Sequence, residues 1–237
     1  MKKGFVVLLG AALLVVLGSS AAFAKGFEVG ASVQYGSLTI YDAGWDERLV
    51  SQAPTGTVSA SYEVVPRVRV SGEYTFGGLS LDEPNDQYVT AYGYRNFRVG
   101  GTFQVLNNVD LLTGWTWFRS SYKDDEGDEI TNTGSGFRVG ISANVPVTDR
   151  ISASVCYAFL PYVYSETLKS WDEEPCANYL GAGHELEAKL SLAFRGGLAA
   201  YVGYRAETYS GTYDYWADDY YDLAGFSGLL AGITYGF

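Results

Sequence analysis

The sequence predicts an all-β protein, a single antiparallel up-and-down transmembrane β-barrel of ten strands. Apolar residues recur at every second position within short segments, which is the period of a strand with two unlike faces. Tyr and Gly are abundant, at 20 and 29 residues, as aromatic girdles and tight turns require. Short and long connections alternate between the segments, which is typical of a barrel that crosses a membrane.

The N-terminus has the organisation of a secretory signal. Lys2 and Lys3 precede an apolar run over Phe5–Leu17, and the small-residue pattern of a cleavage site follows at 22–24. We therefore expect a signal peptide over residues 1–24 and a barrel domain over residues 25–237. The alternative, an uncleaved anchor, would require a longer apolar run.

The first half of the barrel domain contains five alternating segments. Each places four or five residues, mostly apolar, on one face, and tight turns at Pro66-Arg67 and Asn107-Asn108 join two of the pairs. We expect strands over Phe27–Gly36, Thr57–Val65, Val68–Phe76, Phe97–Val105 and Val109–Trp117.

The second half repeats the pattern five times. Its short turns lie at Pro146–Asp149 and Arg195–Gly197. We expect strands over Phe137–Val145, Ile151–Phe159, Leu186–Phe194, Leu198–Ala206 and Gly228–Phe237. Ten segments of about ten residues match a spanning antiparallel barrel; an eight-stranded barrel and a soluble β-sandwich, which also alternates, are the alternatives.

Five long connections would then lie together at one end of the barrel. They carry 19 of the 27 acidic residues but only four basic ones, a formal charge of −15, and lie near 37–55, 77–92, 119–134, 161–182 and 208–223. Such a crown could concentrate divalent cations or share them with lipopolysaccharide phosphates, or it could simply be solvated. The net charge of −11 argues against nucleic acid as a partner.

Charged residues also occupy inward positions of the strands. A barrel of this size has an interior that side chains nearly fill, and charges at low dielectric are expected to pair. We therefore expect a mostly closed lumen with a charge network of Glu28, Glu63, Arg69, Glu73, Arg98, Asp110, Arg138, Glu185, Glu187, Lys189, Arg205 and Glu207. A narrow cation-preferring channel along Glu185, Glu187 and Lys189 is the alternative.

The two cysteines, Cys156 and Cys176, predict a disulfide because the cell envelope is oxidising. Two free thiols are the alternative. Two Cys and one distant His are too few ligands for a metal site, and no cofactor-binding motif is present, so we expect neither metal nor cofactor.

The last long connection contains the candidate binding residues Tyr213, Tyr215, Trp216, Tyr220 and Tyr221, interleaved with aspartates. Flat aromatic faces beside carboxylates suit sugar stacking or protein contact. The alternative is that these aromatics extend an outer girdle and pack the loops together.

The chain ends on the alternating strand GLLAGITYGF, with Tyr235 and Phe237 on its apolar face. This strand resembles the closing strand of a Gram-negative outer-membrane barrel, and the whole domain is similar to the small OmpA-like and opacity-type barrels. The resemblance implies a monomer in the outer membrane with periplasmic termini and external loops, and roles in envelope structure, surface interaction or narrow channels. It also implies recognition of Tyr235 and Phe237 by the barrel-assembly machinery.

Ten strands also invite comparison with the omptins, outer-membrane proteases whose rim carries an Asp pair facing an Asp–His pair. Here the single histidine, His184, is expected at the outer end of the eighth strand, and it has no Asp two residues before it. A general base needs a partner within hydrogen-bond reach, so we expect no catalytic site. A rim hydrolase remains the minor alternative.

Overall fold

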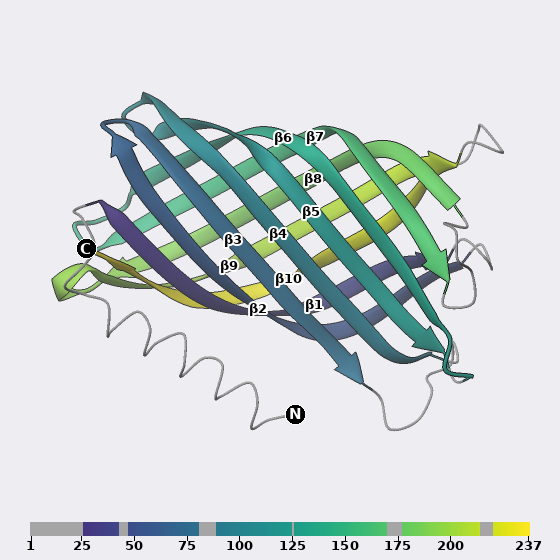
Figure 1. Ribbon diagram of the computed structural model, residues 1–237. Helices are drawn as coiled ribbons and strands as arrows, with labels where there is room; N and C mark the ends of the chain where they lie inside the picture. Colours follow the sequence, from purple (N-terminus) through teal and green to yellow (C-terminus); the bar gives the residue numbers. More distant parts are fainter. Residues whose placement is uncertain (1–25, 43–46, 81–88, 125, 170–176, 214–219) are drawn as a thin grey trace.

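Ten antiparallel strands close into a barrel in the computed structural model (Figure 1). The structure describes residues 26–42, 47–80, 89–124, 126–169, 177–213 and 220–237. The strands are β1 (Phe27–Asp42), β2 (Glu47–Val65), β3 (Val68–Ser80), β4 (Val89–Leu106), β5 (Val109–Asp124), β6 (Glu129–Pro146), β7 (Ile151–Lys169), β8 (Ala177–Ala193), β9 (Leu198–Tyr213) and β10 (Tyr220–Gly236).

The barrel closes by pairing β1 with β10, from Glu28 opposite Gly236 to Ile40 opposite Ala224. The amide of Phe237 also donates a hydrogen bond to the carbonyl of Phe27, at 2.9 Å. The predicted tenth strand and ten-stranded barrel are therefore confirmed, and the eight-stranded and sandwich alternatives are wrong. Closure leaves no free sheet edge, which satisfies the backbone of every strand within a membrane.

Glycines allow the closing strands to approach each other closely. Gly36 and Gly228 are partners in the β1–β10 pairing. A Cβ on Gly36 would lie 1.9 Å from the carbonyl oxygen of Ser227, and one on Gly228 would lie 2.3 Å from that of Tyr35. Only a residue without a side chain fits at this point of the seam.

The two ends of the barrel differ. The hairpin turns and the C-terminus lie at one end, on the left in Figure 1, which we call the turn end. The other ends of the strands, for example Asp42 of β1 and Ala177 of β8, define the opposite end, which we call the loop end. Among the described residues the helical structure is the short 3-10 turn η1 (Arg195–Gly197) between β8 and β9. No helix in the described part of the chain is long and apolar enough to span a membrane.

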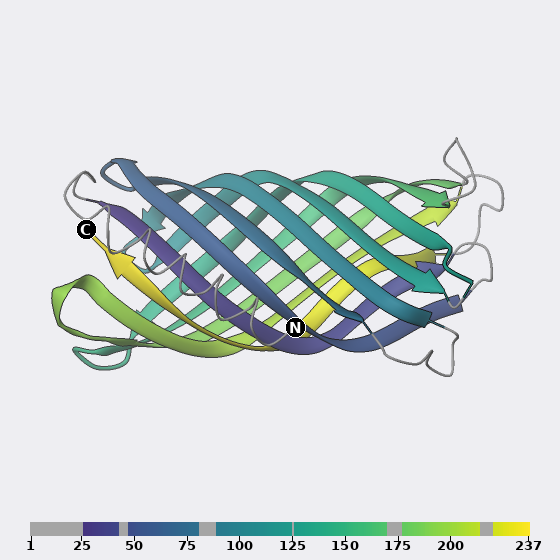
Figure 2. The ribbon, with the colours of Figure 1, turned by 60° about the horizontal axis from the view of Figure 1, so that its bottom comes forward.

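The strands extend further toward the loop end than the sequence predicts. β4, for example, begins at Val89 rather than at Phe97, and β7 continues to Lys169 rather than ending at Phe159. Parts of all five predicted loops are thus strand. The prediction ended each strand where its outward face stops being apolar, but the pairing continues past that point. Figure 2 shows the long strands running obliquely to the barrel axis.

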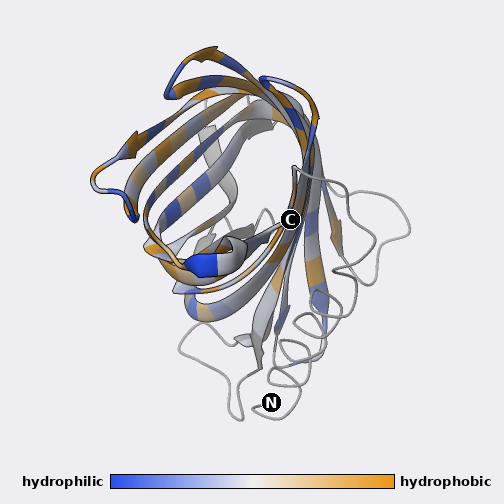
Figure 3. Ribbon diagram, turned by 90° about the vertical axis from the view of Figure 1, so that its left-hand side faces the viewer, coloured by the Kyte–Doolittle hydropathy of each residue, from blue (hydrophilic) through white to orange (hydrophobic). Residues whose placement is uncertain are grey.

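The outward positions form an apolar wall. Leu229 is 72% exposed and Tyr35 is 62% exposed, as expected for side chains that contact lipid rather than water. Figure 3 views the barrel from the turn end and shows hydrophobic and hydrophilic residues alternating along the strands. This alternation confirms the predicted faces and directs the polar residues into the lumen.

Candidate functional site in the barrel lumen

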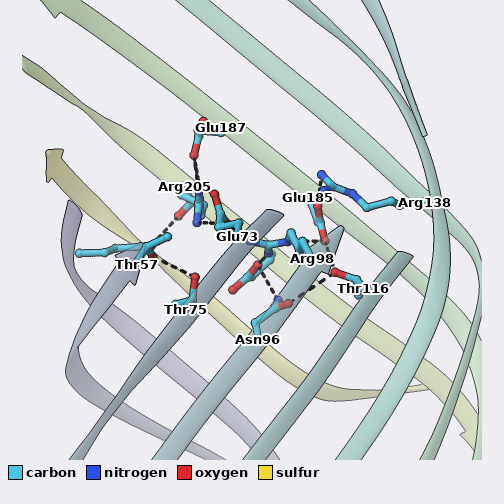
Figure 4. Close-up of polar contacts among 12 residues, drawn as sticks. Thr57, Glu73, Thr75, Asn96, Arg98, Thr116, Arg138, Glu185, Glu187 and Arg205 are labelled. Atoms are coloured by element: carbon cyan, nitrogen blue, oxygen red, sulfur yellow. Dashed lines mark hydrogen bonds and ion pairs between the residues drawn. The ribbon is translucent and has the colours of Figure 1, made fainter. Parts of the chain in front are cut away.

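Arg98 on β4 is the centre of a buried ionic network inside the barrel (Figure 4). Its Nη1 lies 2.6 Å from Oε1 of Glu73 on β3, and its Nε lies 3.1 Å from Oε1 of Glu185 on β8. Its Nη2 forms an ion pair with Glu207 on β9. One guanidinium therefore joins the carboxylate of its neighbour on the adjacent strand to two carboxylates from β8 and β9 across the lumen.

Arg205 on β9 forms a second centre beside the first. It donates to both carboxylate oxygens of Glu73, at 2.8 and 3.0 Å, and pairs with Glu187 on β8. Lys189 lies 2.6 Å from Glu187, and Arg138 on β6 lies 2.7 Å from Glu185. We call these residues the ionic lattice: Glu73, Arg98, Arg138, Glu185, Glu187, Lys189, Arg205 and Glu207.

The ionic lattice is electrically balanced, because it holds four bases and four carboxylates. Removing one member would leave a buried partner uncompensated, which costs far more than the intact pairs contribute. The lattice therefore fixes the relative positions of five strands more than it adds net stability. Its eight residues all belong to the predicted charge network, and here they pair with one another.

Three uncharged side chains complete the lattice from the loop end. The hydroxyl of Tyr94 donates to Oε1 of Glu207 at 2.5 Å. The amide of Asn96 donates to the hydroxyl of Tyr209 at 2.9 Å, and that hydroxyl donates to Oε1 of Glu185 at 3.1 Å. The predicted network contained only charged inward residues, so none of these three was predicted. Each of the three lies an even number of residues from Arg98 or Glu207 along the same strand, and therefore faces the lumen. This spacing could have predicted them.

An apolar plug fills the lumen on the loop-end side of the lattice. Phe118 and Tyr209 stack with their ring centroids 4.2 Å apart, and Phe226 packs 6.0 Å from Tyr94. The plug consists of two buried clusters: Leu38, Ala53, Tyr92, Tyr94, Tyr122, Ile130 and Phe226, and Phe118, Leu160, Val163 and Tyr209. The sequence predicted a polar interior and not this apolar layer.

Buried inward residues are found around the whole circumference of the lumen. Every strand contributes a buried inward residue, none more than 7% exposed: Leu38, Ala53, Thr75, Tyr94, Phe118, Asn132, Leu160, Glu185, Tyr209 and Phe226. A water-filled pore would expose the side chains that line it, whereas these ten side chains are buried.

The turn-end half of the lumen is open instead. A cavity of about 510 Å³ lies there, which we call the vestibule. Small hydroxyl side chains such as Ser59, Ser71 and Ser154 line it, together with the turn-end side of the ionic lattice. Its wall therefore combines hydroxyl and charged groups with apolar ones such as Leu112.

Four residues of the predicted charge network do not join the lattice. Glu28 and Arg69 line the vestibule, while Glu63 and Asp110 lie near the hairpin turns. Glu63 and Arg69 are partners in the β2–β3 pairing, yet none of the four forms an ion pair with another described residue. Near the turns water solvates these charges, so nothing forces them to pair.

His184 lies on the outer wall of the barrel. Its side chain is exposed, and Nδ1 shares a 2.8 Å hydrogen bond with the hydroxyl of Tyr157. Its ring also packs against Phe159, with centroids 5.1 Å apart. The prediction of a position at the strand end is wrong, because β8 begins seven residues earlier, at Ala177. Among the described residues no carboxylate pairs with it, and no group of three or more His, Cys, Asp or Glu could hold a metal ion.

Cys156 lines the vestibule, whereas Cys176 lies outside the described residues. The next residue, Ala177, pairs with Thr167, which is eleven residues along β7 from Cys156. At about 3.3 Å per residue that separation is about 36 Å, and a disulfide requires Cα atoms within about 7 Å. The predicted disulfide could form only if β8 paired with β7 in a different register.

The remaining predicted residues are the aromatics of the C-terminus and of the last long connection. Tyr235 and Phe237 are in edge-to-face contact, with ring centroids 4.7 Å apart, and Phe237 also packs against Phe27. Tyr215 and Trp216 lie outside the described residues. The backbones of Tyr213, Tyr220 and Tyr221 are in strands. The loop binding site stays a prediction.

A closed antiparallel barrel with an apolar outer wall and a polar, charge-paired interior is a transmembrane β-barrel. Residues 10–194 match the family described as outer membrane protein beta-barrel domain. The chain belongs to this family, and it is a protein of the bacterial outer membrane.

Solved structures share the fold at low sequence identity. The outer-membrane protease OmpT of Escherichia coli is 11% identical with a TM-score of 0.53, and the match covers 89% of this chain and 97% of that one. The translocator domain of the autotransporter NalP of Neisseria meningitidis is 11% identical with a TM-score of 0.50, covering 100% and 97%. No curated protein matches the sequence. These likenesses concern the fold alone.

Proposed function

We propose that this protein is a non-conducting outer-membrane barrel that serves envelope structure or surface interaction through its acidic loops. The observation that carries the proposal is the buried ring of inward residues contributed by all ten strands. A pathway for hydrated ions needs a continuous wet surface, and the ring interrupts it between the vestibule and the loop end.

The ionic lattice weighs against the cation-channel alternative. Glu185 and Glu187, which could have lined a cation route, already pair with Arg98, Arg138, Arg205 and Lys189. A carboxylate that is neutralised by a fixed guanidinium offers little binding energy to a passing cation. The same lattice would have to be dismantled before an ion could cross.

In this proposal the turn end faces the periplasm and the loop end faces the cell exterior, as is general for these barrels. The crown would meet lipopolysaccharide, divalent cations or an extracellular ligand, and Tyr235 and Phe237 would be read by the barrel-assembly machinery. The protein would act as a monomer.

The proposal includes no catalytic step. His184 faces outward and bonds to a tyrosine rather than to a carboxylate, so it lacks the partner that a general base needs. Incubating the folded protein with a library of unlabelled peptides should yield no cleavage. Cleavage that His184→Ala abolishes would establish the hydrolase alternative.

Solute release from vesicles tests the closed lumen. Vesicles containing the folded protein should lose trapped K⁺ and a small sugar no faster than protein-free vesicles. The heat-dependent electrophoretic mobility of barrels, checked on the same vesicles, verifies that the protein is folded and inserted. Rapid K⁺ loss with retention of the sugar would replace the proposal with a narrow channel.

A further inference from the structure

Two arginines lie opposite each other on the outside of the barrel. Arg95 on β4 and Arg119 on β5 are partners in the β4–β5 pairing. Each lies two residues along its strand from an outward aromatic residue, Phe97 or Trp117, and so faces outward as well. Both are exposed, with the Arg119 side chain at 52%. Lys123, four residues further along β5, is exposed on the same face.

These cations have little internal compensation. Arg119 lies 3.7 Å from Oε1 of Glu129 and 3.4 Å from Oγ1 of Thr131, both long contacts at an exposed position. Arg95 has no ion-pair partner among the described residues. Like charges directly opposite on neighbouring strands are destabilising. A protein with a net charge of −11 therefore keeps a locally repulsive basic pair on its outer wall.

An aromatic ledge lies directly beneath the pair. Phe97 and Trp117, two residues toward the turn end on each strand, stack with their centroids 5.6 Å apart, and Trp115 packs against Trp117 at 6.1 Å. Aromatic rings of transmembrane barrels gather at the boundary between the hydrocarbon and the headgroups. The arginines thus lie on the headgroup side of that boundary.

The height of the pair agrees with this position. Arg95 is ten residues from Val105, the last outward apolar residue of β4 before its hairpin turn. At a rise of about 3.4 Å per residue and a tilt of about 40°, the pair lies about 26 Å above Val105, where an apolar band about 25 Å tall ends.

We propose that Arg95 and Arg119 form a clamp for a phosphate monoester of an outer-leaflet glycolipid, whose acyl chains lie along Phe97 and Trp117; this rests on the proposed orientation, in which the loop end faces the cell exterior. Two guanidinium forks from adjacent strands can bind one phosphate through charge-assisted, bidentate hydrogen bonds. The anion would relieve the repulsion between the arginines. The aromatic ledge below favours a lipid phosphate over free phosphate, because only a lipid has acyl chains that can pack against the ledge.

Binding of lipid A to the full barrel in detergent, measured by native mass spectrometry, tests the clamp. Lipid A with two phosphates should bind the wild type. The dissociation constant should rise about tenfold or more in the variant Arg95→Gln/Arg119→Gln, which removes the charge-assisted bonds. Arg95→Lys/Arg119→Lys should lie in between, because lysine keeps the charge but loses the fork.

The matched control is Arg150→Gln/Arg195→Gln, which removes two exposed arginines from the turn end and should leave the affinity unchanged. Heat-dependent mobility verifies folding of each variant, and Arg95→Gln alone is used if the double variant does not fold. Equal affinity of dephosphorylated lipid A, or of the double Gln variant, would overturn the clamp. If inorganic phosphate displaced lipid A when present at the same concentration, the clamp would not be specific for a lipid phosphate.

Discussion

The loop-end and turn-end halves of the lumen use inward positions of the same ten strands, yet their interiors are opposite in character. The loop-end half is filled by Phe118, Tyr209, Phe226 and other buried apolar side chains. The turn-end half is a vestibule lined by serines and solvated charges. The ionic lattice lies between them and shares Tyr94 and Tyr209 with the plug.

The difference teaches that one alternation pattern can build both a packed apolar plug and an open cavity. Strand geometry decides only which residues face inward. The size and polarity of those residues then decide whether water enters. Between the two halves, each lattice carboxylate lies against a fixed guanidinium or ammonium group.

The largest effect is expected from removing the centre of the lattice. Arg98→Ala leaves Glu73, Glu185 and Glu207 without a shared partner, and loss of one member of a buried ion pair costs about 3–5 kcal/mol. Urea unfolding in lipid vesicles measures the free energy. Arg69→Ala, which removes a vestibule arginine without an ion pair, is the control and should change stability by less than about 0.5 kcal/mol. Equal losses in the two variants would mean that the halves do not differ energetically.

The next effect concerns the plug. Phe226→Ala removes a buried ring that packs against Tyr94, and such truncations cost about 3 kcal/mol. Thr234→Ala, a vestibule residue on the same strand, should cost much less because water replaces the lost contacts. The same urea titrations separate the two. A small loss for Phe226→Ala would show that the plug is loosely packed.

A smaller effect is expected from the neutral part of the lattice. Asn96→Ala removes the amide that donates to Tyr209 and Glu207, and unsatisfied buried acceptors cost about 1–3 kcal/mol. Asn144→Ala, at an exposed vestibule position, provides the matched control. If both substitutions proved neutral, Asn96 would have no structural role in the lattice.

The smallest effect concerns the cysteines. In this register Cys156 and Cys176 cannot meet, so thiol titration of the denatured, unreduced protein should find two free thiols, and reductant should not change stability. A disulfide closing about 20 residues would instead contribute about 3 kcal/mol that reductant removes. That loss would require a different pairing of β7 with β8.

The sequence predicted the strands, their faces and eight lattice residues because strand periodicity is local. It could not predict the plug, since Leu38 and Phe226 become partners only when β1 meets β10, almost 190 residues apart. It also ended strands too early: Tyr94 and Tyr209 lie beyond the predicted segments, where outward residues are no longer apolar. His184 was misplaced for the same reason.

Single-channel recording in a planar bilayer tests the central claim, the closed lumen, most directly. Membranes containing the folded wild type, with insertion verified on protein recovered from the same preparation, should stay at the baseline current over the full voltage range. Steady, cation-selective openings would contradict the seal formed by the apolar plug and the ionic lattice.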